Sequence, residues 1–295
     1  MLEEKNIPEL KFHNIHKKDL EFEIVSNWEV LDKDSPLKHN PFIPHRIRFY
    51  SLLFILKGEG YHYIDFKKYS YKRGSIIFIS KEQVHAFEKN LDRDAYFMVF
   101  TEDFLERSSM GSSLMHRLSL YNYHLYPPTI QLQEEQIPIF ENLVTRIRHE
   151  YHQQVDHFTE ELIQSSLKIF LFLAERIRRK SRDLEEKSVY HETFLQFQKL
   201  VQDNVLENRK VSFYANEMAS STKKLNRAAH HIVDQTAKEF IKDQLIIEMK
   251  RLLMNTSFSI KEIAYRTGFE DPTNFIKYFK KDTDMTPSDF RKDYF

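Results

Sequence analysis

The sequence contains no cysteine, and glycine and proline are scarce, with 5 and 9 among 295 residues. The lack of cysteine excludes disulfides, thiolate metal ligands and a cysteine nucleophile. Few glycines and prolines, together with 41% hydrophobic and 30% charged residues, exclude the disordered and fibrous classes and are typical of a globular chain. This length predicts about two domains.

Neither sign of charge is in excess, because Lys+Arg and Asp+Glu each total 44. The net charge therefore does not indicate a nucleic-acid partner, and any basic surface must be local. The start of the chain has no basic segment followed by an apolar one, as a signal peptide would. The most apolar runs, Leu52–Leu56 and Ile169–Ala174, are far shorter than the ~20 residues that span a bilayer. We therefore expect a cytoplasmic protein without a membrane partner.

Short runs rich in isoleucine, phenylalanine and tyrosine predict β-strands between about residues 20 and 100. These runs are Phe22–Val25, Arg48–Leu56, Tyr61–Asp65, Ser75–Ile79 and Ala95–Phe100. Glycines at positions 58, 60 and 74 mark turns between them. Close spacing without intervening helical patterns favours a small antiparallel barrel or sandwich, which we place in residues 1–130.

From about residue 133 to 182 the apolar residues follow a helical period and predict two amphipathic helices, in an antiparallel hairpin. The second helix ends in the basic run Arg176–Lys180, which we interpret as a solvated helix end. We expect this segment, residues 131–182, to form a homodimer, because its apolar stripes exceed what one small barrel can cover. The charged run Ser181–Ser188 lacks apolar periodicity, and we place a linker at 183–190.

The last hundred residues contain one arrangement twice: a short amphipathic helix, a tight turn and a second helix, which is the helix-turn-helix plan. In the first copy Val211–Ala219, with Ser212 as candidate cap, precedes Thr222–Val233. In the second, Ser259 and Glu262 predict a capping box before a turn at Gly268, and the second helix covers Thr273–Lys281.

A single apolar stripe along Ala237–Asn255 predicts one helix that connects the two copies. Its length of about 28 Å is close to the roughly 34 Å of one DNA turn, so both second helices could enter successive major grooves.

The run Ser259–Lys281 has an Ile-Ala-x-x-x-Gly-Phe core and a Phe-x-x-x-Phe-Lys helix, and the tail Met285–Arg291 reads Met-Thr-Pro-Ser-Asp-Phe-Arg. These residues strongly resemble the AraC/XylS family of transcription regulators, over about Val211–Arg291. The resemblance implies a sequence-specific DNA-binding regulator in which residues 191–295 form the DNA-binding domain. Its partner is double-stranded DNA, with RNA polymerase as a second partner if the protein is an activator.

Two features depart from the family pattern. Asp234 and Asp284 stand where the family usually has glycine, and aspartate tolerates the left-handed backbone less well. Ala228 and Ala229 replace bulky apolar residues of the first recognition helix. We therefore expect the first helix-turn-helix to be packed more loosely than the second.

The outward faces of the two recognition helices carry the predicted DNA contacts, since Leu225 and Phe275 must face the core. The contacts are Lys223, Lys224, Asn226, Arg227, Thr273, Asn274, Lys277, Lys280 and Lys281. Arginine and lysine suit guanine, and asparagine suits adenine, whereas we expect Lys280 and Lys281 to grip phosphate. For each residue the alternative is a polar side chain that only coats a solvated helix.

The runs Pro44–Gly60 and Lys72–His85 resemble the cupin-like sensor barrel common in this family. Metal-binding cupins use three histidines and a glutamate, but only His45 and His85 remain here. Ile47 and Ser51 occupy the other positions. Two ligands are too few for a stable divalent site, so the resemblance implies a metal-free sensor without cofactor or catalytic residue.

A small-molecule effector in this barrel is the remaining expectation. The candidate contacts are His45, Tyr50, Tyr61, Tyr63 and His85, with Phe54, Phe78 and Phe87 as further lining. Ordinary core packing is the alternative for all of them. His149, His152 and His157 also cluster, but His149-Glu-Tyr-His152 is one residue short of the HExxH zinc pattern, so we interpret them as a solvated helix face.

The sequence thus predicts a two-domain α+β protein, with an N-terminal cupin-like antiparallel β-barrel and helical dimerisation segment, and a C-terminal all-α domain. No P-loop, dinucleotide fingerprint or G-x-S-x-G motif occurs, and we expect no enzyme activity. The alternatives are a small-molecule-binding module that acts through protein partners, its DNA-binding half having decayed, and an enzymatic cupin.

Overall fold

The structure, a computed structural model, describes residues 9–14, 17, 20–26, 40–88, 93–106, 114–123, 125–180 and 189–293. The chain divides into two compact units, one within residues 8–184 and one within residues 185–295. The linker predicted at 183–190 falls on this division, although most of it lies outside the described residues.

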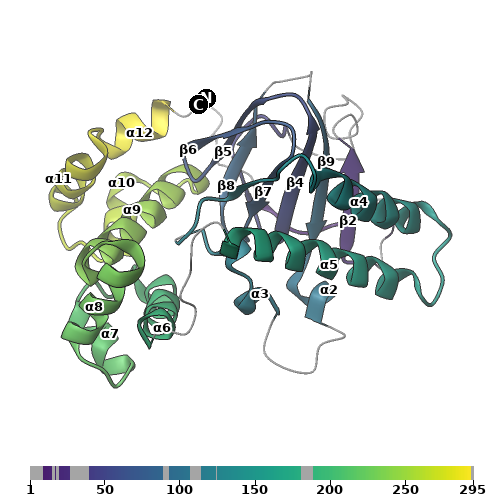
Figure 1. The fold of residues 1–295 in the computed structure, drawn as a ribbon. Helices are drawn as coiled ribbons and strands as arrows, with labels where there is room; N and C mark the ends of the chain where they lie inside the picture. Colours follow the sequence, from purple (N-terminus) through teal and green to yellow (C-terminus); the bar gives the residue numbers. More distant parts are fainter. Residues whose placement is uncertain are drawn as a thin grey trace. The chain divides into compact units, whose positions relative to one another are not determined.

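The first unit is built on two five-stranded sheets (Figure 1). The strands are β1 Glu9–Leu10, β2 Phe22–Ser26, β3 His45–Ile47, β4 Tyr50–Lys57, β5 Gly60–Ile64, β6 Lys67–Tyr71, β7 Ser75–Ile79, β8 Val84–Phe87, β9 Asp94–Phe100 and β10 Thr129–Gln131. Sheet A has the order β1-β3-β8-β5-β6, and sheet B has the order β10-β7-β4-β9-β2. The pairs are antiparallel apart from β1–β3, which is parallel. The described strands form this pair of sheets rather than a closed barrel, which is a small correction to the predicted architecture.

Strand β4 is an almost continuous apolar run because sheet B is buried on both of its faces. Leu53 and Ile55 point into the core between the two sheets. Leu52 and Phe54 point to the opposite face, where the helices of this unit lie. A short run without polar alternation is the pattern that a strand covered on both sides requires.

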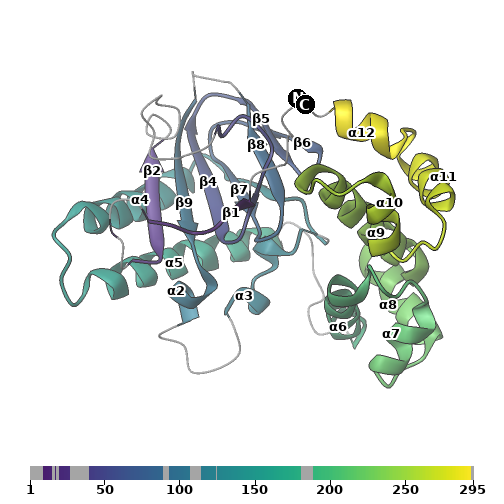
Figure 2. The ribbon, with the colours of Figure 1, turned by 180° about the vertical axis from the view of Figure 1, so that it is seen from behind.

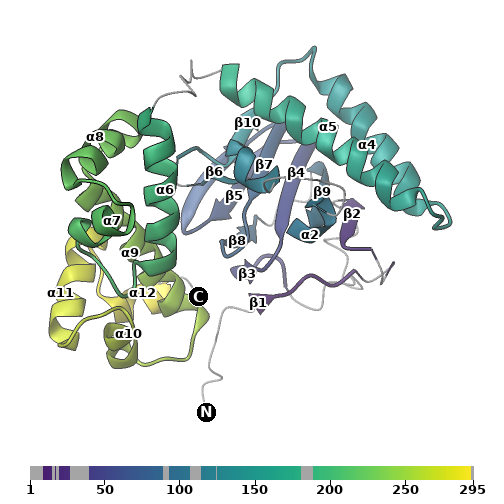
Figure 3. The same ribbon diagram turned by 90° about the horizontal axis from the view of Figure 1, so that it is seen from below.

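The helices of this unit are α2 Glu102–Glu106, α3 Leu114–Arg117, the 3₁₀ turn η1 Ser119–Tyr121, α4 Ile137–His152 and α5 Thr159–Lys180. The predicted hairpin is confirmed, since α4 and α5 lie side by side over sheet B (Figure 1, Figure 3). Phe140 and Phe170 are buried with ring centroids 4.8 Å apart, and both rings contact Phe54 of β4. Each fully buried phenylalanine stabilises the unit by about 1.5–3 kcal/mol. Sheet B of the same chain thus covers the apolar stripes, so the reason given for a dimer, that one barrel cannot cover them, is wrong.

The C-terminal end of α5 also differs from its prediction as a solvated helix end. Arg178 is buried and donates hydrogen bonds to the carbonyl oxygens of Ser119 (3.2 Å) and Leu120 (3.4 Å). One turn earlier, the buried Glu175 accepts a hydrogen bond from the Ser119 hydroxyl at 2.8 Å. The end of α5 is therefore docked onto η1, and the sequence pattern missed this because the partners are almost sixty residues away.

The second unit is helical throughout its described residues (Figure 2). Its helices are α6 Val189–Asn204, α7 Val211–Glu217, α8 Thr222–Val233, α9 Ala237–Asn255, α10 Ile260–Arg266, α11 Pro272–Thr283 and α12 Pro287–Asp293. Both helix-turn-helix units are confirmed, and α8 and α9 have the predicted bounds. Within the described part of the chain, no helix is long and apolar enough to cross a bilayer.

Candidate nucleic-acid interface and effector site

The first helix-turn-helix consists of α7, a four-residue turn and α8. Ser221 caps α8, and its side chain accepts a hydrogen bond from the Lys224 backbone N–H at 3.2 Å. In the turn Ala219 has a left-handed φ of 45°, and the N–H of Ser220 donates to the carbonyl of Ala215. The predicted cap at Ser212 is wrong, because α7 begins before it and has Lys210 at the N-cap position.

The second helix-turn-helix, α10 and α11, repeats this backbone. The predicted capping box between Ser259 and Glu262 is confirmed. Gly268 occupies the place of Ala219 with a φ of 72°, and the N–H of Phe269 donates to the carbonyl of Ala264, as in the first copy. Asp271 then caps α11 by accepting from the Thr273 backbone N–H at 2.8 Å. Two separate stretches of sequence thus form the same turn, which supports one shared role.

Each recognition helix is followed by a residue with a left-handed backbone conformation, at the position where the family usually has glycine. Asp234 has φ 54° and Asp284 has φ 59°, and each donates its N–H to a carbonyl four residues earlier. Aspartate therefore adopts the glycine conformation at both sites. It does so at a cost that glycine would not incur.

The looser packing expected around Ala228 and Ala229 is not observed, because both residues are fully buried. Helix α6 packs against α8, and small side chains permit such a close approach. Phe197 of α6 contacts Phe240 of α9 and Tyr214 of α7, with ring centroids 5.6 Å apart in both cases. Aromatic residues of the neighbouring helices thus supply the core volume that α8 lacks.

Phe290 and Arg291, the last two residues of the family's tail motif, hold α12 against its neighbouring helices. Arg291 donates hydrogen bonds to the carbonyls of Leu253 (2.9 Å) and Phe258 (2.8 Å). Phe290 is buried against Phe279 of α11, with ring centroids 5.5 Å apart. These contacts hold α11 on the scaffold and orient its outer face.

That outer face carries the predicted DNA contacts of the second copy, namely Thr273, Asn274, Lys277, Lys280 and Lys281, and all five are exposed. In the first copy Lys223, Lys224 and Arg227 are exposed as well. Leu225 and Phe275 are fully buried, as expected. One apolar side chain, Ile276, is exposed on the outer face of α11, and it was missed because only polar residues were considered as DNA contacts.

Asn226 differs from the other predicted contacts because its amide is engaged within the protein. Its Nδ2 donates to the carbonyl of Thr222 at 3.0 Å, and its Oδ1 accepts from the backbone N–H of Ala237 at 3.0 Å. The second bond ties α8 to the first residue of α9. We therefore assign Asn226 a positioning role in place of the predicted adenine contact.

In the first unit, the structure brings His45 and His85 together in the core between the sheets. They are direct partners on β3 and β8, with ring centroids 4.2 Å apart. His62 of β5 joins them, with its Nε2 at 3.2 Å from His85 Nδ1. The buried Arg93 lies beside this cluster, 5.1 Å above the ring of Phe87, and donates to the Tyr71 hydroxyl at 3.3 Å. We call His45, His62, His85 and Arg93 the interior polar cluster.

The three predicted tyrosines do not lie in this cluster. Tyr61 and Tyr63 are exposed on the outside of sheet A. Tyr50 is buried on the opposite face of sheet B, packed against Tyr121 at 5.0 Å. Phe54 and Phe78 lie on that face too. Alternation along β5 explains the error, since a strand that turns Tyr61 and Tyr63 outward must turn His62 inward.

Comparison with known proteins finds a match for each of the two units. A family profile described as a helix-turn-helix domain matches residues 214–293, and one described as an AraC-like ligand binding domain matches residues 38–167. The chain belongs to the AraC/XylS family of transcription regulators.

The relatives of this AraC-family chain extend over most of its length. The HTH-type transcriptional regulator YfiF of Bacillus subtilis is 22% identical over 288 residues, which cover 96% of this chain and 87% of the relative. The HTH-type transcriptional activator RhaR of Escherichia coli is 22% identical over 254 residues, covering 85% of this chain and 87% of RhaR. Among solved structures, ToxT from Vibrio cholerae has 17% identity and a TM-score of 0.42, covering 92% of this chain and 98% of ToxT.

Within the AraC-like ligand-binding domain, the interior polar cluster has a strongly perturbed electrostatic environment. Burial lowers the pKa of His62 to about 3, helped by the charge of Arg93 and by His45. Among the described residues, the buried Nδ1 of His62 has no hydrogen-bond partner. A buried polar atom without a partner costs free energy, so this atom is a candidate contact for a ligand.

Over the part of the chain that the structure describes, no group of three or more His, Cys, Asp or Glu residues is arranged to hold an ion. The cluster predicted to coat a helix, His149, His152 and His157, is exposed.

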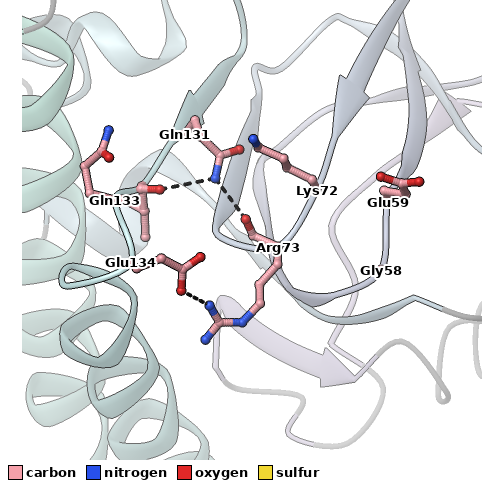
Figure 4. A pocket seen from close by; sticks show the side chains of 8 residues that line it. Gly58, Glu59, Lys72, Arg73, Gln131, Gln133 and Glu134 are labelled. Carbon is pink, nitrogen blue, oxygen red and sulfur yellow. Dashed lines mark hydrogen bonds and ion pairs between the residues drawn. The ribbon is translucent and has the colours of Figure 1, made fainter.

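A polar pocket of about 590 Å³ lies on the same unit, at the turns that precede β5 and β7 and the segment that leads into α4 (Figure 4). Arg73 forms an ion pair with Glu134 across it, and Gln131 donates to the carbonyl of Arg73 at 2.9 Å. Lys72 and Glu59 complete its charged lining. None of the predicted effector contacts belongs to this lining.

Proposed function

We propose that this AraC-family regulator reads two successive major grooves of one DNA duplex through α8 and α11. The observation that carries the proposal is the repeated turn geometry, which presents a polar face on each of two recognition helices, with α9 between the two copies in the sequence. The 19 residues of α9 correspond to about 28 Å, against roughly 34 Å for one DNA turn.

The exposed side chains divide into base readers and phosphate contacts. Lys223, Lys224 and Arg227 suit the guanine acceptors O6 and N7, and Asn274 suits adenine. Lys280 and Lys281 lie in the last turn of α11, where we propose that they bind phosphate and fix the register. The test is selection from a random-sequence duplex library by the full-length chain, and the proposal fails if no sequence is enriched.

The alternative of a decayed DNA-binding half finds no support in the structure. Both recognition helices keep their side-chain caps, and their predicted lysines and Arg227 remain exposed. RhaR is named a transcriptional activator. We propose activation for this chain as well, with RNA polymerase as the second partner, and in vitro transcription from a selected operator distinguishes activation from repression.

We further propose that a small-molecule effector binds at the interior polar cluster. The cluster offers the imidazole of His62, which is neutral because burial lowers its pKa, beside the buried guanidinium of Arg93. This combination suits a compact polar molecule with a carboxylate or several hydroxyls. A thermal-shift screen of small acids, sugars and amino acids tests this. Compounds that stabilise the wild type but not His62→Phe support the site, and equal stabilisation of both proteins argues against it.

We propose that no catalytic step takes place at this cluster and that it binds no metal. Elemental analysis of protein purified without chelator should find well under one divalent ion per chain. A stoichiometric ion that is lost in His45→Ala or His85→Ala would support the enzymatic cupin instead.

A homodimer remains a proposal, now on a different surface of the helical hairpin. Ile169 and Phe172 lie one turn apart on the outer face of α5 and are 50% and 45% exposed. Large apolar side chains that share one exposed face favour association. Sedimentation of the full chain at micromolar concentration should give a dimer, and Phe172→Asp should give a monomer. A monomeric wild type would end this proposal.

A further inference from the structure

Ile276 is an apolar side chain at the edge of the polar outer face of α11. It is 36% exposed, while its neighbour Phe275 is fully buried. At helical spacing it lies beside Thr273 and Lys280, on the face that carries the proposed DNA contacts. The fold therefore does not use Ile276 as a core residue, and it leaves a branched aliphatic group where the helix would meet base edges.

The first recognition helix has a different residue at the equivalent place. Both helices have 12 residues, and counting from the caps Ser221 and Asp271 aligns Asn226 with Ile276. The amide of Asn226 is occupied within the protein by Thr222 and Ala237. The outer face of α8 is thus left with cationic readers, whereas α11 adds an aliphatic one.

We infer that Ile276 contacts the 5-methyl group of a thymine in the major groove. Thymine presents the only methyl group among the four bases there, and apolar side chains recognise it by contact. Asn274, two residues earlier, suits an adenine. The half-site of α11 therefore contains an A·T pair read through its methyl group, and the half-site of α8 is read through guanines. This inference rests on the proposed entry of α11 into the major groove.

The experiment removes the methyl group and the side chain independently. The probe is a duplex that the full-length chain selects from a random-sequence library, in which each thymine is replaced in turn by deoxyuridine, which lacks only that methyl. One replacement should weaken wild-type binding about four-fold, the value expected for one buried methyl-sized group. Ile276→Ala should weaken binding to the unmodified duplex similarly and show no further decrease in affinity on that deoxyuridine duplex.

A matched control is Ile139→Ala, which removes an isoleucine side chain that is 52% exposed on α4 of the other unit. It should bind every duplex as the wild type does. Ile276→Ala is expected to fold normally, since alanine favours helix, and its melting curve should match that of the wild type.

Two outcomes overturn the inference while the proposed function stands. In one, no deoxyuridine replacement affects the wild type. In the other, Ile276→Ala remains as sensitive as the wild type at every thymine. If the full-length chain enriches no sequence from the library, the proposed function itself fails.

Discussion

Replacing Asn226 with alanine should destabilise the second unit and leave its base preferences unchanged. The substitution removes the acceptor for the backbone N–H of Ala237, a fully buried residue at the start of α9. A buried donor left without a partner costs about 1–3 kcal/mol. The better helix propensity of alanine offsets roughly 0.5 kcal/mol. The net loss is about 1–2 kcal/mol, or a decrease in melting temperature of roughly 5–15 °C for a unit of this size.

Asn274→Ala is the matched control, because Asn274 is an exposed asparagine on α11. Its removal should change stability by less than about 0.5 kcal/mol but reduce discrimination at one adenine by about 1–3 kcal/mol. Thermal unfolding by circular dichroism and binding to single-base operator variants measure both quantities. If Asn226→Ala keeps full stability and loses an adenine preference, the positioning role is refuted and the contact predicted from the sequence is restored.

Three further predictions concern pH, backbone strain and phosphate contacts. Neutral His62 should contribute stability fully above about pH 6.5 and lose it as the pH falls toward 3, by up to about 1.4 kcal/mol per unit. The free energy of unfolding in urea should therefore fall more between pH 7 and pH 5 for the wild type than for His62→Phe. An equal fall in both proteins would contradict a neutral, buried His62. Asp284→Gly should raise stability by about 0.5–1 kcal/mol in thermal unfolding, because glycine adopts a φ of 59° without strain; a decrease would show that the aspartate side chain is required. Lys280→Ala should weaken binding to all sequences alike and reduce the slope of log affinity against log salt by about one, and a sequence-dependent loss would make Lys280 a base reader.

The features set by local sequence could be predicted, as α8, α9 and the capping box show. The bounds of α9 follow from one apolar stripe, and Ser259 and Glu262 form their box within a single turn. Such patterns depend on neighbours three or four residues apart. Such local patterns predict the correct helix or cap because the prediction does not depend on any distant part of the chain.

Contacts between distant segments could not be predicted in the same way. The burial of Arg178 depends on η1, and the covering of Phe170 depends on β4, more than a hundred residues away in the sequence. The hydrogen bond from Ala237 to Asn226 crosses a helix boundary. Helical spacing therefore identified Asn226 as outward-facing but could not show that its amide is occupied.

The interior polar cluster could be predicted from the sequence only in part. On β3, β5 and β8 a histidine precedes an inward apolar residue by two positions, in the pairs His45 with Ile47, His62 with Ile64, and His85 with Phe87. Strict alternation along β5 would have found His62 in place of Tyr61 and Tyr63. Arg93 has no comparable signal, because it precedes β9 and only the folded sheets bring it to the cluster.

The measurement that tests the central claim most directly is the affinity of the full chain for a library of single-base operator variants, at two salt concentrations. Specificity should fall into two patches about 10 base pairs apart. Lys223→Ala and Arg227→Ala should relax one patch, and Lys277→Ala the other, by about 1–3 kcal/mol for each base that the variant no longer reads. A uniform decrease in affinity in all three variants, or a single patch of specificity, would contradict reading by both helices.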